Sequence, residues 1–419
     1  MNTDSDLAAH DYLAEDDEPV VRHGLPASMR HLSWDAPEAL AGIGTKGLIA
    51  GAVGILGLIV GFFVDSDQFF RSYLVSFVYW LSIALGCLAI SMVHHLSRGA
   101  WGLVIRRVLE GGARTIPFFF LLGLPLLLGL DVLYPWSLPE VVDADEILQK
   151  KAGYLNDFGF ILRYVLYFAV WTALAWVLSR MSLKQDETAN PYLARKMQLL
   201  SAPGLPLYFL AATFASFDWL MSLDPHWYST IYGVWFAAGH GLGGLALVIL
   251  MALFLMRRKP MDQVLAARHF HDWGKLMLAF VMLWAYFSFS QFLIIWAANI
   301  PSETSFYIER TEHGWQWVAL ALIIGHFALP FLLLLSRDLK RKASRLAFVA
   351  ILVLVMRWVD IYWQAAPLFG RETILPHWLD LAGMLGLGGL WVWLFTRQLA
   401  TRAILPINAP NLEEAIGDE

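Results

Sequence analysis

Long apolar stretches separated by short polar or charged loops make up most of this chain. A helix rises about 1.5 Å per residue, so about 20 apolar residues cross a hydrocarbon core about 30 Å thick. Ten stretches reach this length, with predicted bounds 44–64, 72–95, 115–134, 158–179, 204–222, 229–256, 273–298, 314–336, 345–364 and 378–399. Residues 1–43 form an acidic N-terminal tail, and residues 400–419 form a C-terminal tail. The pattern predicts an all-α, polytopic membrane protein.

Lysine and arginine divide unevenly between the two sides of such a membrane domain. One side would hold the chain through Lys46, the loops after the second, fourth, sixth and eighth spans, and the C-terminal tail. That side carries 22 basic residues and the other carries 6. Basic loops stay in the cytoplasm, so we expect both termini to be cytoplasmic. We expect no cleavable signal peptide, because residues 1–43 hold nine Asp or Glu and only two Arg.

The composition supports a membrane protein and limits its redox chemistry. The chain is 58% hydrophobic and 16% charged, whereas soluble domains are about 45–50% apolar and about 25% charged. The single cysteine, Cys87, excludes an intrachain disulfide, a CxxCH haem-attachment site and a four-thiolate iron–sulfur cluster. We therefore expect no covalently bound cofactor and no nucleic-acid partner. A covalently held redox centre would belong to a partner subunit.

Ionisable residues lie well inside the predicted spans, namely Asp218, His240, His326, Arg357 and Asp360. A charge at mid-depth in a bilayer costs at least about 2.5–3.5 kcal/mol. Such residues therefore normally face the bundle interior and mark a path for ions, protons or substrate. The direction of each span places Asp218 near the external boundary and the two histidines near the midplane. Asp360 lies one turn beyond Arg357 toward the outside.

Further ionisable residues extend this set to the cytoplasmic boundary. Lys275 and His271 lie at the start of the seventh span, and His94 and His95 end the second. Ionisable groups therefore occupy both boundaries and the centre, which is the layout expected of a proton path. The predicted path residues are Asp218, His240, Lys275, His326, Arg357 and Asp360.

Simpler roles remain open for these residues. Arg357 and Asp360 are three positions apart, so they share a helix face and could form a neutral pair that only fixes helix packing. His240 and His326 could be packed core residues, or they could together ligate a b-type haem. A transmembrane cytochrome b usually holds two haems, which need four stacked histidines. The sequence lacks a second pair at a suitable depth.

Small residues and mixed segments give further local predictions. Glycines form seams on the first and tenth spans at Gly47, Gly51, Gly54, Gly57, Gly61, Gly383, Gly386, Gly388 and Gly389. Such seams let helix backbones approach closely, so we expect both to be packing faces. The run 239–244 lies inside a span, which favours close packing around His240 or a local helix break over a phosphate loop. Residues 96–113 fit a surface amphipathic helix or an ordinary basic loop.

Three motifs resemble one known family. They are FDWLMSLDPHWYST at 217–230, then HFHDWGK at 269–275 continuing through WAY at 284–286 and FSQF at 289–292 to IWAANIP at 295–301, and WVDIYW at 358–363. They resemble the smaller polytopic subunit of bacterial alternative complex III. That subunit belongs to the NrfD-like, or polysulfide-reductase membrane-subunit, family. The resemblance covers all ten predicted spans, including HLSRGAWG at 95–102.

The resemblance implies a haem-free membrane subunit of a quinol:cytochrome c, or other acceptor, oxidoreductase in the bacterial inner (cytoplasmic) membrane. Ten helices would form two four-helix bundles and two peripheral helices. The implied partners are an iron–sulfur subunit, multihaem and monohaem cytochromes c, a larger NrfD-like sister subunit and membrane lipid. In that family quinol oxidation is generally placed on the sister, and the smaller subunit is thought to offer a proton route. The matched motif positions are Asp218, Asp224, His226, His271, Asp272, Lys275, Gln291 and Asp360; His240 and Arg357 lie outside the matched motifs.

Two other functions remain open. A quinone pocket needs aromatic walls and polar groups that donate to carbonyl oxygens, whether for menaquinone or ubiquinone. The residues that could supply it are Asp218, His226, Trp227 and Tyr228. A stand-alone secondary transporter would carry an inverted repeat, yet the second to fifth and sixth to ninth spans are comparable only in length. The chain is therefore expected to be either a non-catalytic subunit or a quinone-binding redox subunit.

Overall fold

The computed structural model describes residues 25, 29, 32–371 and 373–416, and this part of the chain contains helices but no strand. Most of the predicted N-terminal tail therefore lies outside the described residues. Ten helical segments are long and apolar enough to span a membrane, which confirms the all-α polytopic class. They are Ala39–Val64, Ser66–Ser97, Arg106–Leu128, Asp157–Thr188, Tyr192–Leu223, Tyr232–Leu255, Ala267–Ala298, Trp315–Leu335, Ala343–Phe369 and Trp378–Ala400.

One long helix makes up all or most of eight spans, and the other two are composite. The single helices are α1 (Ala39–Val64), α2 (Ser66–Ser97), α9 (Asp157–Thr188), α10 (Tyr192–Trp219), α11 (Tyr232–Leu255), α12 (Ala267–Ala298), α17 (Ala343–Ala365) and α18 (Trp378–Ala400). The third span joins α4 (Arg106–Ala113), α5 (Ile116–Leu122) and η2 (Leu124–Leu128), and the eighth joins α14 (Trp315–Leu322), η6 (Ile323–Ala328) and α15 (Leu329–Leu335). Short helices in the loops include α3 (Ala100–Leu103), α6 (Leu130–Leu133), α7 (Pro139–Ala144), α8 (Glu146–Lys151), α13 (Pro301–Ile308), α16 (Arg337–Arg341) and α19 (Leu412–Ile416).

Local sequence explains several helix ends. Asp65 Oδ1 accepts a hydrogen bond from Gln68 N at 3.0 Å at the start of α2. Short polar side chains of this kind satisfy backbone N–H groups that have no partner within the first turn. At the other end of a helix, Asn299 terminates α12 in the left-handed conformation (φ 49°), and Pro301 begins α13. Both residues suit these positions because Asn tolerates positive φ and Pro needs no N–H donor.

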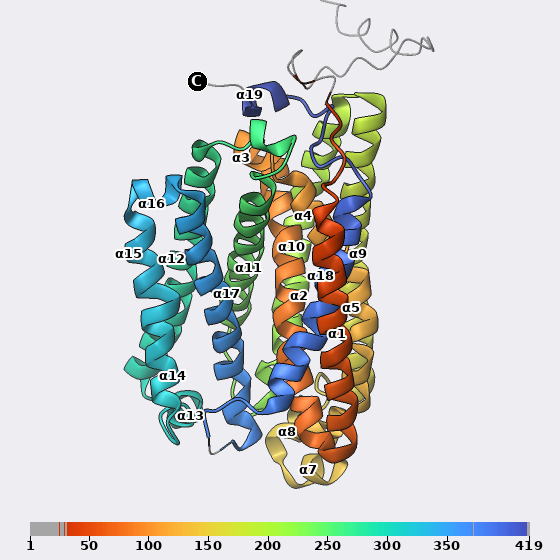
Figure 1. The fold of residues 1–419 in the computed structure, drawn as a ribbon. Coiled ribbons are helices and arrows are strands. Elements are labelled where there is room, and N and C mark those ends of the chain that lie inside the picture. The colour runs from red at the N-terminus through yellow and green to blue at the C-terminus, as the bar shows by residue number, and fades with distance from the viewer. Residues whose placement is uncertain (1–24, 26–28, 30–31, 372, 417–419) are drawn as a thin grey trace, which may run out of the picture.

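The helices form two four-helix bundles that lie side by side (Figure 1). In the first bundle α2, α4–α5, α9 and α10 pack around one another. In the second bundle α11, α12, α14–α15 and α17 do so. Helix α11 also packs against α2 and α10, which joins the two bundles, and α18 packs against α2 with α1 on its outer side. This is the expected arrangement of two bundles with two peripheral helices.

The peripheral helices α1 and α18 lie in backbone contact along the predicted glycine seams. A Cβ added to Gly54 would lie 2.1 Å from Gly386 N, and a Cβ added to Gly389 would lie 2.2 Å from Gly51 N. Only residues without a side chain permit this approach. The outer face of α1 is apolar and exposed, as at Phe63, which is 81% exposed. The predicted packing role of both seams is confirmed.

Both predictions for residues 96–113, a surface helix or a basic loop, are wrong for residues 106–113, whereas residues 98–105 form a connection that contains only the short α3. Helix α4 begins the third span at Arg106 instead of at residue 115, and it packs against α2, α9 and α18. Arg106 and Arg107 are each only 2% exposed. Their charges face carboxylates of Glu110 on the same helix and Asp186 on α9. Arginine is costly to bury alone, and these partners from a distant segment make its burial possible.

The described ends of the chain meet at one end of the molecule, where α3, α16 and α19 lie (Figure 1). We call this the basic end, and the end with α7, α8 and α13 the far end. The C-terminal tail packs onto the basic end instead of leaving it. Ile404 N donates to Trp34 O at 2.7 Å, and α19 contacts α3.

Candidate functional site

A charged pair lies in the interior of the second bundle, on α17. Arg357 and Asp360 are 1% and 0% exposed. Arg357 Nη1 donates to Asp360 Oδ2, as their spacing predicts. Trp284 Nε1 on α12 donates to the same oxygen at 3.0 Å, and Gln364 Nε2 donates to Oδ1 at 3.1 Å. Both carboxylate oxygens of Asp360 are therefore hydrogen-bonded.

His326 shares Trp284 with this pair and lies in a π-helical turn. The His326 ring is 0% exposed and meets the Trp284 ring edge to face, with centroids 4.3 Å apart. Pro330, four residues later, has no N–H to bond the His326 carbonyl, so the regular helix is interrupted here. The turn η6 takes up this interruption, and Leu329 N bonds back to Ile324 O. Single π-helical turns are frequent at functional sites.

His240 lies on α11, where the two bundles meet. Its Nδ1 is 2.7 Å from Tyr208 Oη on α10. Two glycines leave space for Arg357 and for the backbone of His240. A Cβ on Gly239 would lie 2.2 Å from Arg357 Cζ, and a Cβ on Gly86 would lie 1.9 Å from His240 O. The glycine run therefore serves close packing, as one prediction held. The alternative of a helix break is wrong, since α11 runs through it without interruption.

Several nitrogens at this site have no hydrogen-bond partner among the described protein atoms. They are His240 Nε2, both ring nitrogens of His326, and Nε and Nη2 of Arg357. An unpaired buried polar group costs about 1–3 kcal/mol, and more when it is charged. Buried water molecules commonly serve such groups. We call His240, Trp284, His326, Arg357 and Asp360 the central cluster. Its unpaired nitrogens can form hydrogen bonds with water molecules, and its ionisable groups can take up and release a proton.

Polar contacts continue from the central cluster to the far end of α17. Tyr232 Oη donates to Gln364 Oε1 at 2.8 Å. Arg310 is 1% exposed and donates to the carbonyls of Trp363 at 3.1 Å and Gln364 at 2.6 Å. These carbonyls belong to the last turn of α17, where the helix dipole favours a cation. Burial lowers the pKa of the Arg310 guanidinium to about 10.

A cavity of about 530 Å³ opens at the far end beside Arg310. Its wall carries acidic and histidine side chains, namely Asp224, His226, Glu309, Glu312 and His313. Glu309 Oε2 lies 3.9 Å from Arg310 Nη1. Burial raises the pKa of the Glu309 carboxyl, so it holds a proton at higher pH than an exposed glutamate does. The cavity therefore offers proton acceptors where the buried contacts end.

An ion network at the basic end ties the first bundle together. Glu110 accepts from Arg106 Nε at 3.0 Å and from Arg107 Nη1 at 2.5 Å. The C-terminal tail adds Arg402, whose Nη1 lies 3.6 Å from Glu110. Between this end and His240, the described side chains form no continuous hydrogen-bonded chain. Ser201 Oγ on α10 has no partner among them, and it precedes Tyr208 by about 10 Å along the helix.

Two predicted path residues stand apart from the central cluster. Asp218 lies in the first bundle, where Arg163 Nε and Nη2 donate to it at 2.8 and 3.0 Å and Tyr167 Oη donates at 2.7 Å. Lys275 has a side chain that is 57% exposed at the basic end and pairs with Asp272 at 3.0 Å. The other four belong to the central cluster, where Trp284 contacts both His326 and Asp360, and where Gly239, next to His240, packs on Arg357.

The four residues predicted for a quinone pocket lie in different surroundings. Trp227 is buried and stacks on a phenylalanine of α13, with ring centroids 4.3 Å apart. Tyr228 is 62% exposed, and His226 Nε2 lies 2.5 Å from Asp145 Oδ2. Of the four, only His226 lines the far-end cavity, because Asp218 is turned toward α9.

Several buried charges were not predicted from the sequence, namely Glu110, Arg310 and Asp380. Asp380 binds Arg371 Nη1 at 2.8 Å and accepts from Ser72 Oγ at 2.6 Å. Two of the three carry a spacing signal. Glu110 follows Arg106 by one helical turn, and Asp380 stands three residues into α18, in a capping box. Arg310 carries none, because the carbonyls that it binds are present at every residue.

No family model and no curated protein matches this chain. Its function is therefore inferred from the side chains and their contacts.

Proposed function

We propose that this chain is a membrane subunit that carries protons through its second bundle within a quinol-oxidising respiratory complex. The observation that carries the proposal is the central cluster itself, an enclosed ion pair flanked by two histidines with unpaired nitrogens. Each unpaired nitrogen costs stability, which a pair kept only for packing would avoid. Ionisable residues at such depth generally mark a path for ions or protons.

Each residue has a distinct role in the proposed route. His240 and His326 accept and release a proton, for which imidazole is suited by its unperturbed pKa of about 6.5. A proton on either imidazole ring adds a positive charge close to Arg357. Repulsion from Arg357 then favours transfer of that proton toward Asp360. Asp360 balances Arg357 and accepts the moving proton. Beyond it Gln364 and Tyr232 lead toward Glu309 and the far-end cavity.

Orientation and partners follow from sequence features. The basic end faces the cytoplasm, with both termini, by the positive-inside rule. The far end then faces the outside of a bacterial inner membrane and is where protons leave. One cysteine leaves this chain unable to hold an iron–sulfur cluster or a covalently attached haem. The resemblance of the motifs at 217–230, 269–301 and 358–363 implies that electrons pass through an iron–sulfur subunit and cytochromes c, and that a larger NrfD-like sister oxidises menaquinol or ubiquinol.

Proton release per electron tests the proposal. Asp360→Asn and His326→Gln are each introduced into the assembled complex, which is reconstituted in liposomes. Both variants should lower the number of protons released per electron toward the value of quinol oxidation alone. The rate of quinol oxidation should stay near that of the native complex.

Asp218→Asn is the matched control. It also removes the carboxylate of a buried ion pair, but in the first bundle. This variant should keep the native proton yield. An unchanged yield in both cluster variants would refute the route. A loss of quinol oxidation in Asp360→Asn, with Asp218→Asn unaffected, would instead favour a quinone-binding role.

A further inference from the structure

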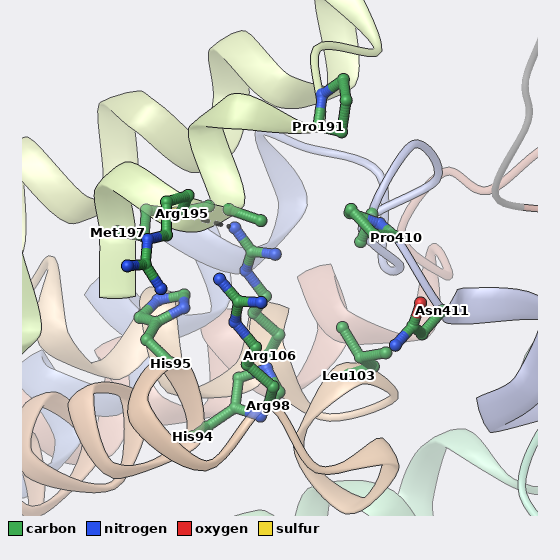
Figure 2. Close-up of a pocket in the computed structure, with 12 residues that line it drawn as sticks. His94, His95, Arg98, Leu103, Arg106, Pro191, Arg195, Met197, Pro410 and Asn411 are labelled. Carbon is green, nitrogen blue, oxygen red and sulfur yellow. Dashed lines mark hydrogen bonds between the residues drawn. The ribbon is translucent and has the colours of Figure 1, made fainter. Parts of the chain in front are cut away.

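A second cavity, of about 410 Å³, lies at the basic end between the end of α2, the start of α10 and the C-terminal tail. Arginine and histidine dominate its polar lining, and none of the described residues that line it is acidic. Figure 2 shows Arg98, Arg106 and Arg195 reaching toward the same region, beside the ring of His95. Three cations from three segments therefore converge on one space.

These three arginines have N–H groups that are not bonded to strong acceptors among the described residues. The Arg98 guanidinium makes no hydrogen bond or ion pair with the described residues. Arg195 binds only the neutral side chain of Gln198, at 3.1 Å. Arg106 donates from Nε to Glu110 and from Nη1 to Gln185, while Nη2 lies 3.0 Å from the sulfur of Met197, a weak acceptor. Glu110 already balances Arg106, but Arg98 and Arg195 have no acidic partner among the described residues, so a bound anion would balance their charges.

The floor of the cavity holds two buried imidazoles. His94 and His95 are 3% and 6% exposed, and their rings lie 5.5 Å apart. His94 Nδ1 and His95 Nε2 have no hydrogen-bond partner among the described atoms. Neutral imidazole has one N–H donor, and buried donors are nearly always bonded. The site therefore combines charged donors at its rim with an unpaired imidazole nitrogen of His95 at its base.

The surroundings supply an apolar surface next to this anion-binding geometry. Tyr192 and Leu199 are 58% and 53% exposed, and they lie on the same face of α10 as Arg195, one turn to either side of it. Exposed apolar side chains there can contact an acyl chain. Basic pockets between transmembrane helices on the cytoplasmic side are suited to anionic head groups.

We infer that this cavity binds a phosphate-bearing anion, either the head group of an acidic phospholipid or a free phosphate. Guanidinium groups match phosphate oxygens in geometry and charge. The inference does not depend on the proposed function, because it concerns a site in the first bundle and the tail.

The test uses the full-length chain purified in a neutral detergent. Native mass spectrometry measures how many phosphatidylglycerol molecules it retains, with phosphatidylcholine of the same acyl chains as comparison. Calorimetry measures binding of inorganic phosphate. Both are repeated with Arg98→Gln combined with Arg195→Gln. A control removes two arginines elsewhere at the basic end, with Arg257→Gln and Arg341→Gln.

The native chain should retain phosphatidylglycerol in preference to phosphatidylcholine, or bind phosphate. The paired cavity variant should weaken that binding about tenfold or more, since a charged hydrogen bond contributes about 1.5–3 kcal/mol. The control pair should bind as the native chain does. Retention of phosphatidylglycerol alone would identify a phospholipid site, and binding of phosphate alone a free-anion site. Binding of neither anion, or equal loss in the control pair, would overturn the inference.

Discussion

The Arg357–Asp360 pair allows packing and proton transfer to be separated by experiment. Replacing Asp360 with asparagine leaves the Arg357 guanidinium without its counter-charge at a position only 1% exposed. Removing one partner of a buried ion pair typically costs 3–5 kcal/mol, because the remaining charge is uncompensated, so we expect a loss of about 3–5 kcal/mol. The asparagine keeps the shape of the carboxylate, so a change in volume contributes little.

Removing both charges should restore most of this loss. In Arg357→Met with Asp360→Asn, an unbranched apolar side chain occupies the space that Gly239 leaves beside the guanidinium. Replacing a buried ion pair by well-packed neutral residues is often neutral or stabilising. We therefore expect a coupling energy of about 2–3 kcal/mol between the two positions in a double-mutant cycle.

Chemical unfolding in micelles, followed by far-ultraviolet circular dichroism, measures the free energies of all four proteins. Proton release per electron is then measured on the assembled complex. The doubly substituted chain should be nearly as stable as the native one and yet release fewer protons. If it regains both stability and native proton release, the pair serves packing alone. A cost below about 1 kcal/mol for Asp360→Asn would show that the guanidinium is better solvated than its burial indicates.

Three further predictions concern other parts of the fold. Gly54→Val should cost at least about 1–3 kcal/mol and lower the unfolding midpoint, because overpacking forces α1 away from α18. Arg310→Gln should cost about 3–5 kcal/mol in the same assay, since two carbonyls at the end of α17 lose a cationic donor. The third prediction concerns pH. The hydrogen bond from His226 lowers the pKa of Asp145 in the folded loop. This interaction stabilises the loop above the pKa of about 3.9 of an unfolded aspartate, and the stabilisation is lost as the pH falls through the lowered pKa of the folded state. The protection of residues 145–151 from hydrogen–deuterium exchange, corrected for the intrinsic rate at each pH, should therefore decrease below about pH 4.

Each of these predictions has a matched control. Gly42→Val places the same side chain on α1, where an added Cβ meets nothing within 4 Å, and should change stability little. Arg341→Gln removes an exposed arginine of the basic end and should leave the unfolding midpoint near the native one. In His226→Gln the protection of the loop, corrected for the intrinsic exchange rate, should no longer depend on pH in this range. Equal effects in variant and control would contradict the corresponding contact.

Much of the fold could be predicted because it depends on one helix at a time. The length of an apolar stretch is set by the bilayer, so all ten spans were found. Spacing along one helix placed Arg357 next to Asp360, and glycine spacing identified the face on which α1 meets α18. The third span was misjudged at its start. Apolar periodicity cannot distinguish an arginine that faces water from one that faces Asp186.

The amino-acid sequence by itself determined the number of spans, the glycine seams and the ion pair on α17, because each depends on neighbours within one or two helical turns. Only the tertiary structure decided that His240, Trp284 and His326 surround that pair and that Asp218 does not. These residues come from different helices, and the rotation of each helix about its axis follows from how all the side chains pack together. The burial of Arg310 could not be predicted for the same reason, because the carbonyls that it binds lie beside it only when the end of α17 packs there.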